Sequence, residues 1–234
     1  MSAVLSTLAS ALETHRSSAD QFLRDPRSPK IMEFADWALT ENASVIWQKI
    51  FSDSINGSGR RDFQFIFHLG DVAGKKVFEI DEVLDIIGDY SSYGKVSLIL
   101  DTREADTLWC RLNGRGAESI VSGPASTGAA KRYLFIFNTM RIDYLAVVQG
   151  SSIMHFSHDG QIQLASPSPV SILGIVNART RFSIGCQLGV LLGQDCPHSV
   201  ALGLAVSGAW STPVSAPDAT ALLDYMKEWQ KRIY

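Results

Sequence analysis

Two short apolar segments flank the dipeptide Asp159-Gly160, and this arrangement restricts the local fold more than any other feature of the chain. Residues 153–156 and 162–165 have the apolar content of short strands. Asp-Gly is typical of the tight two-residue turn that joins antiparallel strands. The pattern therefore predicts a β-hairpin with Asp159-Gly160 as its turn.

The register of this hairpin determines where its histidines lie. A turn at Asp159-Gly160 places His155 opposite Leu164, among apolar side chains. Side chains alternate between the two faces of a strand, so His155 and His158 are predicted on opposite faces. We expect a buried His155 and an exposed His158, a pair that cannot readily bind one metal ion.

Further strands are predicted from short apolar segments. Phe63, Phe65 and Phe67 recur at every second position, which is the period of a half-buried strand. The other predicted strands cover residues 76–80, 96–100, 133–137 and 144–148. Four of the predicted strands follow one another within residues 133–165, which favours antiparallel neighbours.

Two helices are predicted inside this strand-rich region. Asp101 and Glu104 match a capping box, in which each side chain accepts a hydrogen bond from the backbone N–H of the other residue. A helix is expected to begin there. Asp81 is a second candidate N-cap, for a helix that ends at Gly88.

Helices are also predicted at both ends of the chain. Ser28 followed by Pro29 is typical of a helix start, and residues 1–52 are predicted to form a helical N-terminal segment. The amphipathic pattern of residues 216–233 predicts a C-terminal helix. Its apolar face, which includes Trp229, is expected to pack on the sheet and close the core.

Two segments remain ambiguous at this level. Residues 114–131 are rich in Gly, Ala and Ser and are too long for an ordinary connection, so they predict either a mobile loop with a function or a disordered insertion. Residues 170–210 are apolar but contain frequent glycines, and their periodicity does not distinguish strand from helix.

Together these patterns predict an α+β fold with helical ends and a mostly antiparallel, strand-rich core over residues 63–210. A chain of 234 residues is long enough to bury a core and short enough to favour one domain, here residues 1–234.

The overall charge excludes some classes of partner. The net charge is -3, which provides no attraction for nucleic acid, and the two long uncharged stretches contain too many Pro, Gly and Ser residues to predict a membrane span. Three cysteines without paired spacing and an N-terminus without Lys or Arg favour a reducing, cytoplasmic location.

Charged residues are scarce in the second half of the chain. Residues 142–217 contain five, namely Asp143, Asp159, Arg179, Arg181 and Asp195. This scarcity indicates a surface that is covered, either by the protein's own helices or by a partner. The leading hypothesis is a non-catalytic interaction or assembly subunit that binds a protein partner or itself through this region, as a homo-oligomer.

An enzyme is the alternative hypothesis. Cys196, His198 and Asp195 supply the thiol, base and orienting carboxylate of a Cys/His-dependent hydrolase or transferase, with Asp159 as another possible orienting group. Adjacency in sequence does not by itself create hydrogen bonds among them, and Asp195 beside Cys196 disfavours a thiolate. The more ordinary interpretation is an unreactive thiol beside a loop histidine.

A third hypothesis is a small-molecule sensor or carrier with a pocket beneath residues 114–131. No cofactor and no metal site are predicted. The segment from Asn56 to Arg61 lacks the Lys-Ser/Thr of a phosphate-binding loop, and the segment from Gly70 to Gly74 lacks the full dinucleotide-binding pattern.

Overall fold

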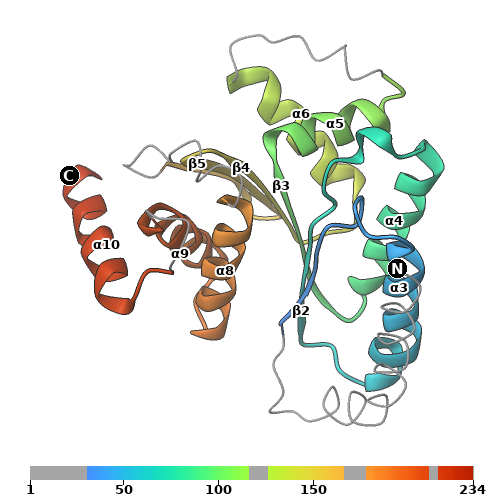
Figure 1. Cartoon of the computed structure of the whole chain (residues 1–234), viewed down its shortest axis with the longest axis horizontal. Coiled ribbons are helices and arrows are strands. Elements are labelled where there is room, and N and C mark those ends of the chain that lie inside the picture. Colours follow the sequence, from blue (N-terminus) through green and yellow to red (C-terminus); the bar gives the residue numbers. More distant parts are fainter. Residues whose placement is uncertain (1–30, 116–125, 166–177, 211–215, 234) are drawn as a thin grey trace.

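The computed structural model describes residues 31–115, 126–165, 178–210 and 216–233. A six-stranded sheet lies between two layers of helices (Figure 1). The predicted mixture of helices and strands is confirmed. The predicted mostly antiparallel core is wrong, because three of the five strand pairings are parallel.

The strands occupy the sheet in the order in which they occur along the chain. They are β1 (Ile31–Phe34), β2 (Phe63–Phe67), β3 (Gly94–Asp101), β4 (Tyr144–Gln149), β5 (Ser152–Ser157) and β6 (Gly160–Ala165). Strands β1 to β4 are parallel, and β5 and β6 add two antiparallel pairings. We call the edge at which β1 to β4 end the carboxyl edge, and the opposite one the amino edge.

One face of the sheet forms the larger core with the helices that connect the parallel strands. Phe65 and Phe67 of β2 and Leu98 of β3 are fully buried there. The elements of this layer are α3 (Ala43–Ile50), η1 (Phe51–Ile55), η2 (Asn56–Ser58), η3 (Val72–Gly74), α4 (Val77–Tyr90), α5 (Thr102–Leu112) and α6 (Ser126–Thr139). The predicted capping box of Asp101 and Glu104 begins α5.

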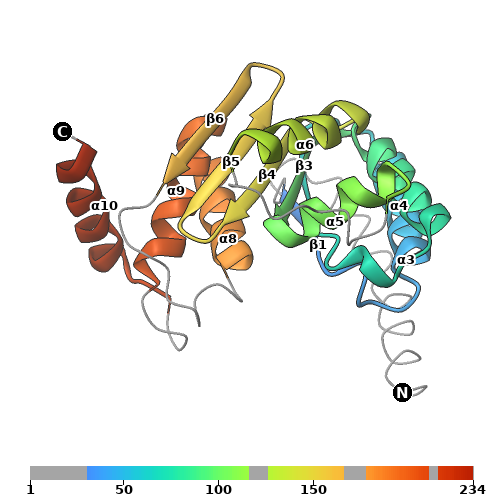
Figure 2. The same cartoon turned by 90° about the horizontal axis from the view of Figure 1, so that it is seen from above.

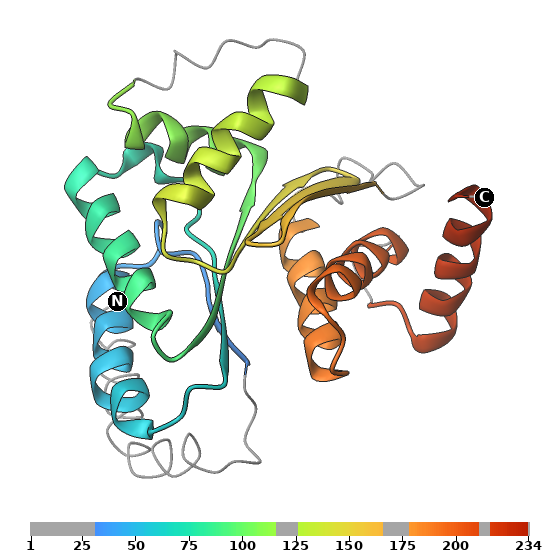
Figure 3. The ribbon, with the colours of Figure 1, turned by 180° about the vertical axis from the view of Figure 1, so that it is seen from behind.

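The second face is covered by the C-terminal helices, as Figure 3 shows from behind. Ile66 of β2 and Ile99 of β3 point to this face and contact the buried residues Phe182 and Leu204. The helices are α8 (Ala178–Leu191), α9 (Cys196–Ala209) and α10 (Ala219–Ile233), and α10 packs against α9 on its outer side (Figure 2). The ambiguous region is thus helical from residue 178 onward, and residues 170–177 lie outside the described ranges.

Helices α8 and α9 touch through their backbones. A Cβ added to Gly185 would lie 2.7 Å from the Cα atom of Gly203, and one added to Gly189 would lie 2.6 Å from the Cα atom of Ser199. The recurrent glycines of this region therefore permit close contact between two helices.

Several predicted elements differ from the structure. Residues 31–34 form a strand and not part of an N-terminal helix, although α3 lies where the helical pattern continues; residues 1–30 lie outside the described ranges. Residues 77–80 begin α4, which is capped at Lys76 and not at Asp81.

The predicted strand 133–137 is part of α6, and this helix also takes in the end of the predicted loop 114–131. Tyr133, Ile136, Phe137 and Met140 are buried at helical spacing, whereas Leu134 and Phe135 between them are exposed. Aromatic residues raised the apparent strand propensity of a segment whose burial follows a period of 3.6. Residues 116–125 of the loop lie outside the described part of the chain.

The hairpin is present with a shifted turn. Ser157 pairs with Gly160, so His158 and Asp159 form the turn and His155 lies opposite Ile162, not Leu164. Gly160 has a φ of 136°, which only glycine adopts without strain. The predicted burial of His155 and exposure of His158 are confirmed.

The structure also explains much of the low charge of residues 142–217. Strands β4 and β5 are buried on both faces, and α8 and α9 cover the sheet beside them. The protein's own helices therefore account for much of the covered surface.

Helix α10 packs mainly against α9, with Trp229 partly buried against the smaller core, so it does not cover the sheet in the way that was predicted. No helix within the described ranges is both long and apolar enough to cross a membrane. That residues 1–234 form one domain stays a prediction.

Candidate functional site

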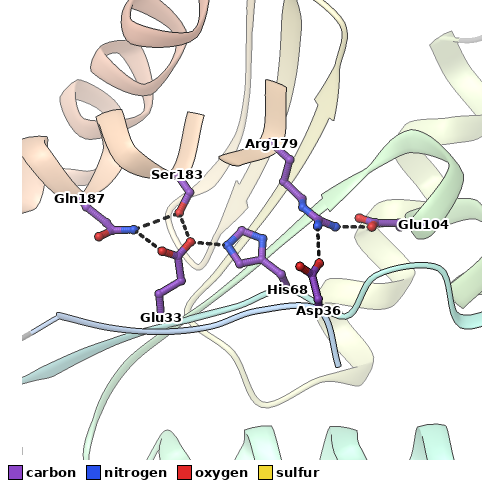
Figure 4. A network of polar contacts seen from close by, with 7 residues as sticks. All are labelled: Glu33, Asp36, His68, Glu104, Arg179, Ser183 and Gln187. Carbon is purple, nitrogen blue, oxygen red and sulfur yellow. Dashed lines mark hydrogen bonds and ion pairs between the residues drawn. The ribbon is translucent and has the colours of Figure 1, made fainter. Parts of the chain in front are cut away.

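The carboxyl edge brings together polar side chains that are far apart in the sequence. Open sheets with parallel strands bind their ligands outside the carboxyl ends of those strands. Figure 4 shows two groups of side chains at this edge, one around Glu33 and the other around Arg179.

Glu33 of β1 is the centre of the first group. Its Oε1 atom accepts hydrogen bonds from Nε2 of His68 and from Oγ of Ser183, both at 2.7 Å, and Oε2 accepts one from Nε2 of Gln187 at 2.9 Å. Burial alone would raise the pKa of Glu33, but the hydrogen bonds from His68, Ser183 and Gln187 outweigh it and lower the pKa to about 2. Glu33 is therefore a carboxylate at neutral pH.

His68, directly after β2, is held by that carboxylate. Its side chain is nearly fully buried, and the bond to Glu33 places the ring hydrogen on Nε2. Within the described part of the chain, the buried Nδ1 atom has no hydrogen-bond partner. An unpaired buried polar atom is unusual, which makes Nδ1 a candidate acceptor for a ligand hydroxyl.

Arg179, in the first turn of α8, is the centre of the second group. It forms ion pairs with Asp36, at 2.9 Å, and with Glu104. Burial alone would lower the pKa of Arg179, but Glu104 and Asp36 raise it, so the guanidinium remains charged. A cation is unfavourable at a helix N-terminus, and these two carboxylates offset that cost.

Each carboxylate of the second group is held in place by its own element. Glu104 is 7% exposed, and its Oε2 atom also accepts the backbone N–H of Asp101 in the capping box of α5. Asp36 has a φ of 54°, an uncommon left-handed backbone for a residue other than glycine. Its neighbour Ala38 donates a 2.7 Å hydrogen bond to Leu69 beyond β2, which ties this turn to the edge.

The imidazole of His68 lies between the two groups, with Glu33 on one side and Asp36 and Arg179 on the other (Figure 4). The carboxyl edge therefore combines an oriented imidazole that has a free acceptor, a guanidinium and the N-terminus of α8. These are groups that can accept a proton from a hydroxyl and stabilise an anionic oxygen.

The residues predicted from sequence lie at the amino edge instead. Asp195 is the N-cap of α9 and accepts hydrogen bonds from the backbone N–H of His198 at 3.0 Å and from its Nδ1 atom at 2.6 Å. The structure therefore brings Asp195 and His198 together, and His198 is exposed. Cys196 contacts a different histidine: its Sγ atom is 3.2 Å from Nε2 of His155.

This arrangement does not activate the thiol. Burial raises the pKa of Cys196 to about 11, and the nearby carboxylates of Asp195 and Asp159 act in the same direction. Burial also lowers the pKa of His155 to about 4, so both partners are neutral at pH 7. A nucleophilic cysteine requires the opposite shift of the thiol pKa.

No residue at the carboxyl edge was predicted from the sequence to have a functional role. Their signal was the polar residue at or directly after a strand, as in His68 after β2 and Asp101 at the end of β3. That signal has meaning only when the strands are parallel, because only then do their ends meet. Because the core was predicted to be mostly antiparallel, these polar residues at strand ends were not expected to meet.

The comparisons with known proteins bear on the fold. No protein-family model matches the chain, and no curated protein does. The structure resembles that of a putative sugar kinase from Clostridium perfringens, with a TM-score of 0.58 and 14% identity, over 94% of this chain and 58% of that one.

Two nucleoside kinases are similarly close in structure. The adenosine kinase from Sinorhizobium meliloti has a TM-score of 0.59 and 13% identity, over 89% of this chain and 56% of that one. The nucleoside kinase from Methanocaldococcus jannaschii, described as an archaeal member of the ribokinase family, has a TM-score of 0.58 and 14% identity, over 90% and 61%.

These likenesses contradict the leading hypothesis from sequence. A non-catalytic assembly subunit, characterised by protein binding and oligomer formation, does not agree with a fold shared with kinases. The chain spans less than two thirds of the length of these three kinases. Identities of 13–14% establish the arrangement of helices and strands, and the chain has the fold seen in sugar and nucleoside kinases.

Proposed function

We propose that the chain is a phosphotransferase that moves a phosphoryl group from a nucleoside triphosphate to a hydroxyl of a sugar-like or nucleoside-like small molecule. The fold is consistent with this class of reaction, since its structural neighbours are titled sugar, adenosine and nucleoside kinases. The observation that carries the proposal is the unpaired Nδ1 atom of His68 beside Arg179 at the carboxyl edge.

In the proposed reaction, the acceptor hydroxyl donates a hydrogen bond to Nδ1 of His68. The hydroxyl oxygen attacks the terminal phosphorus, its proton passes to Nδ1, and the bond from phosphorus to the diphosphate oxygen breaks. The products are a phosphate ester and a nucleoside diphosphate. Glu33 orients the ring through Nε2 and stabilises the imidazolium that forms, as carboxylates do beside catalytic histidines.

Arg179 and the N-terminus of α8 would stabilise the charge on the transferred phosphoryl oxygens, the main contribution of an enzyme to phosphoryl transfer. The ligand must first replace Asp36 as a partner of Arg179. Asp36 is about half exposed, at 49% of its side-chain area, so this ion pair can open toward solvent. Asp36 and Arg179 lie on the side of His68 that faces away from Glu33, so the opened pair would leave room for the ligand beside the imidazole.

Phosphoryl transfer from nucleotides commonly uses Mg²⁺. Among the described residues, no group of three His, Cys, Asp or Glu side chains is placed to hold a metal ion. Asp36 and Glu104 are both bound to Arg179, and no step is assigned to a metal.

The test is product formation by the full chain. ATP and GTP are incubated with ribose, fructose, adenosine and cytidine, and phosphate esters are identified by mass spectrometry. We expect an ester from at least one acceptor, and a His68→Gln variant should lower kcat by about 10²-fold or more, the usual contribution of a general base. His158→Gln, at the exposed hairpin turn, is the matched control and should keep the wild-type rate.

Two results would contradict the proposal. One is the absence of a phosphate ester from every acceptor while circular dichroism shows a folded protein. The other is a His68→Gln variant with an unchanged kcat.

A further inference from the structure

A cavity opens near the amino edge, on the face of the sheet that α8 and α9 cover. Its volume is about 550 Å³, within the range of about 300–1,000 Å³ that is typical of small-molecule sites. Ile66 and Ala146 contribute to its wall on the sheet side, and Phe182 and Val200 contribute on the helix side. All four are nearly fully buried, so this part of the wall is apolar.

The cavity is not a gap that the two helices can close between them. A Cβ on Gly185 would already be 2.7 Å from the carbonyl oxygen of Leu202 and from the Cα atom of Gly203, so α8 and α9 are in backbone contact. Protein interiors contain few voids larger than a water molecule. A hollow of this size beside two touching helices is therefore large enough to hold a small molecule.

Charge restricts the kind of molecule. Among the described residues that line the cavity, the formally charged ones are Asp159 and Asp195, and both are acidic. The remaining polar groups are neutral at pH 7, because burial lowers the pKa of His155 and raises those of Cys186, Cys196 and Tyr144. An anion would lose its hydration here without gaining a cationic partner.

Aromatic and polar groups on the wall restrict it further. The rings of Tyr144 and His155 lie 5.7 Å apart at an angle of 31°, and Phe182 contributes a third ring from α8. The contact between Cys196 and His155 uses one donor and one acceptor of this neutral pair, which leaves one donor and one acceptor over. Ring faces favour a flat ligand, and the remaining groups favour one with its own donor or acceptor.

We propose that this cavity binds an uncharged, planar heteroaromatic molecule of about the size of a purine or an indole, without a phosphate or carboxylate. The site is separate from the carboxyl edge, because its lining extends from the amino edge to the middle of the sheet and includes neither Glu33 and His68 nor Arg179. The inference does not rest on the proposed phosphotransferase activity.

The test measures binding of defined probes to the full chain by calorimetry and by thermal shift. Indole, benzimidazole, adenine and hypoxanthine are compared with indole-3-carboxylate and benzimidazole-5-carboxylate as matched anions. We expect saturable binding of at least one neutral probe, and affinities at least about tenfold weaker for the corresponding anion. Bound probe should also slow modification of Cys196 by a neutral disulfide reagent.

Two variants locate the site. Ala146→Phe and Cys196→Trp each fill the cavity from a different side, and each should weaken binding at least about tenfold. Ile184→Phe, on the exposed face of α8, should leave it unchanged, and His68→Gln should do the same because it alters only the carboxyl edge.

The proposal would be overturned if no neutral probe bound to the wild-type chain. Unchanged affinity in both filling variants, or equal affinity for neutral and anionic probes, would have the same consequence. Because His68→Gln separates the two edges, failure of this proposal is distinguishable from failure of the proposed reaction.

Discussion

At the scale of single residues, the carboxylates of the carboxyl edge are stabilised in two different ways. Glu33 accepts hydrogen bonds from three side chains, whereas Asp36 and Glu104 share the single guanidinium of Arg179. A carboxylate that loses such partners destabilises the fold, most of all when it is buried as Glu104 is, so each arrangement has a measurable consequence for stability.

The first consequence concerns Glu33→Gln, which removes a carboxylate that is ionised only in part of the pH range. The folded-state pKa is lowered from 4.5 to about 2, so the stabilisation is fully present above pH 4.5 and is lost as the pH falls toward 2. We expect the free energy of unfolding to fall by about 1–3 kcal/mol at pH 7, which is typical of hydrogen bonds to a charged group, and to fall by less at pH 3. Urea unfolding at both pH values measures it.

The control for this measurement is Glu82→Gln on the exposed face of α4, which should change the free energy of unfolding by less than about 0.5 kcal/mol. A difference between Glu33→Gln and wild type that stays constant from pH 7 to pH 3 would show that the carboxylate charge is not the stabilising feature.

The second consequence concerns Arg179→Met, which leaves the buried carboxylate of Glu104 without its cation. We expect the free energy of unfolding to fall by about 3–5 kcal/mol, the usual cost of removing one partner of a buried ion pair. The double variant Arg179→Met/Glu104→Gln should recover part of this loss, because the unpaired charge is then absent. Thermal and urea unfolding of the two variants provide the comparison.

Arg103→Met serves as the exposed counterpart, since Arg103 is 80% exposed and pairs with Asp71 at the surface. This variant should lower the free energy of unfolding by no more than about 1 kcal/mol. If Arg179→Met were as mild as Arg103→Met, the network around Arg179 would not be a buried one in solution.

At the scale of elements, the pair α8 and α9 depends on glycine. A methyl group added to Gly185 would overlap backbone atoms of α9, and one added to Gly203 would overlap the side chains of Phe182 and Cys186. Helix α10 is different: it lies outside α9, and its residues Leu223 and Met226 are 56% and 40% exposed.

Gly185→Ala tests the helix contact. Alanine has the higher helix propensity by about 1 kcal/mol, but here its methyl group forces two backbones apart, and we expect a net destabilisation of about 1–3 kcal/mol. Gly88→Ala in α4 is the matched control, because its added methyl group would meet Arg141 Cβ at an ordinary 3.8 Å. That variant should be about 0.5–1 kcal/mol more stable than wild type. Opposite signs for the two variants in one unfolding assay would support the close contact of α8 and α9 at Gly185, and equal signs would contradict it.

The position of α10 changes what is expected of Trp229. Had this helix closed the core, Trp229→Ala would cost about 3–5 kcal/mol. Trp229 is only partly buried against the smaller core. We therefore expect Trp229→Ala to lower the free energy of unfolding by about 1–2 kcal/mol, in proportion to the apolar area that is no longer buried. A melting temperature lowered as far as that of a full core deletion would place α10 in the core after all.

At the scale of the whole molecule, the sheet is unevenly protected. Strands β3 and β4 lie in its middle with both faces covered, whereas β6 is an edge strand whose residues are mostly exposed. Local opening is easiest where few apolar contacts must be broken.

Hydrogen exchange should follow this pattern. We expect peptides from β3 and β4 to exchange at least about tenfold more slowly than peptides from β6 and α10, as measured by mass spectrometry at neutral pH. Equal protection of β6 and β4 would indicate that another surface covers the edge strand in solution.

The sequence by itself determined the features that depend on neighbouring residues. Strands at Phe63–Phe67 and within 96–100, 144–148, 153–156 and 162–165, and the capping box of α5, all follow from local periodicity and side-chain chemistry. These patterns arise from contacts within a few residues, so they can be read without knowing the rest of the fold.

Only the tertiary structure decided how the strands pair and which side chains meet. Parallel pairing depends on connections that run through a helix, and two of the helices between strands, α4 and α6, had been predicted in part as strands. Ser183 reaches Glu33 across 150 residues, and Arg179 reaches Asp36 across 143, because α8 packs over the edge at which the parallel strands end. Such a site has no local pattern, since the residues that form it are neighbours in space alone.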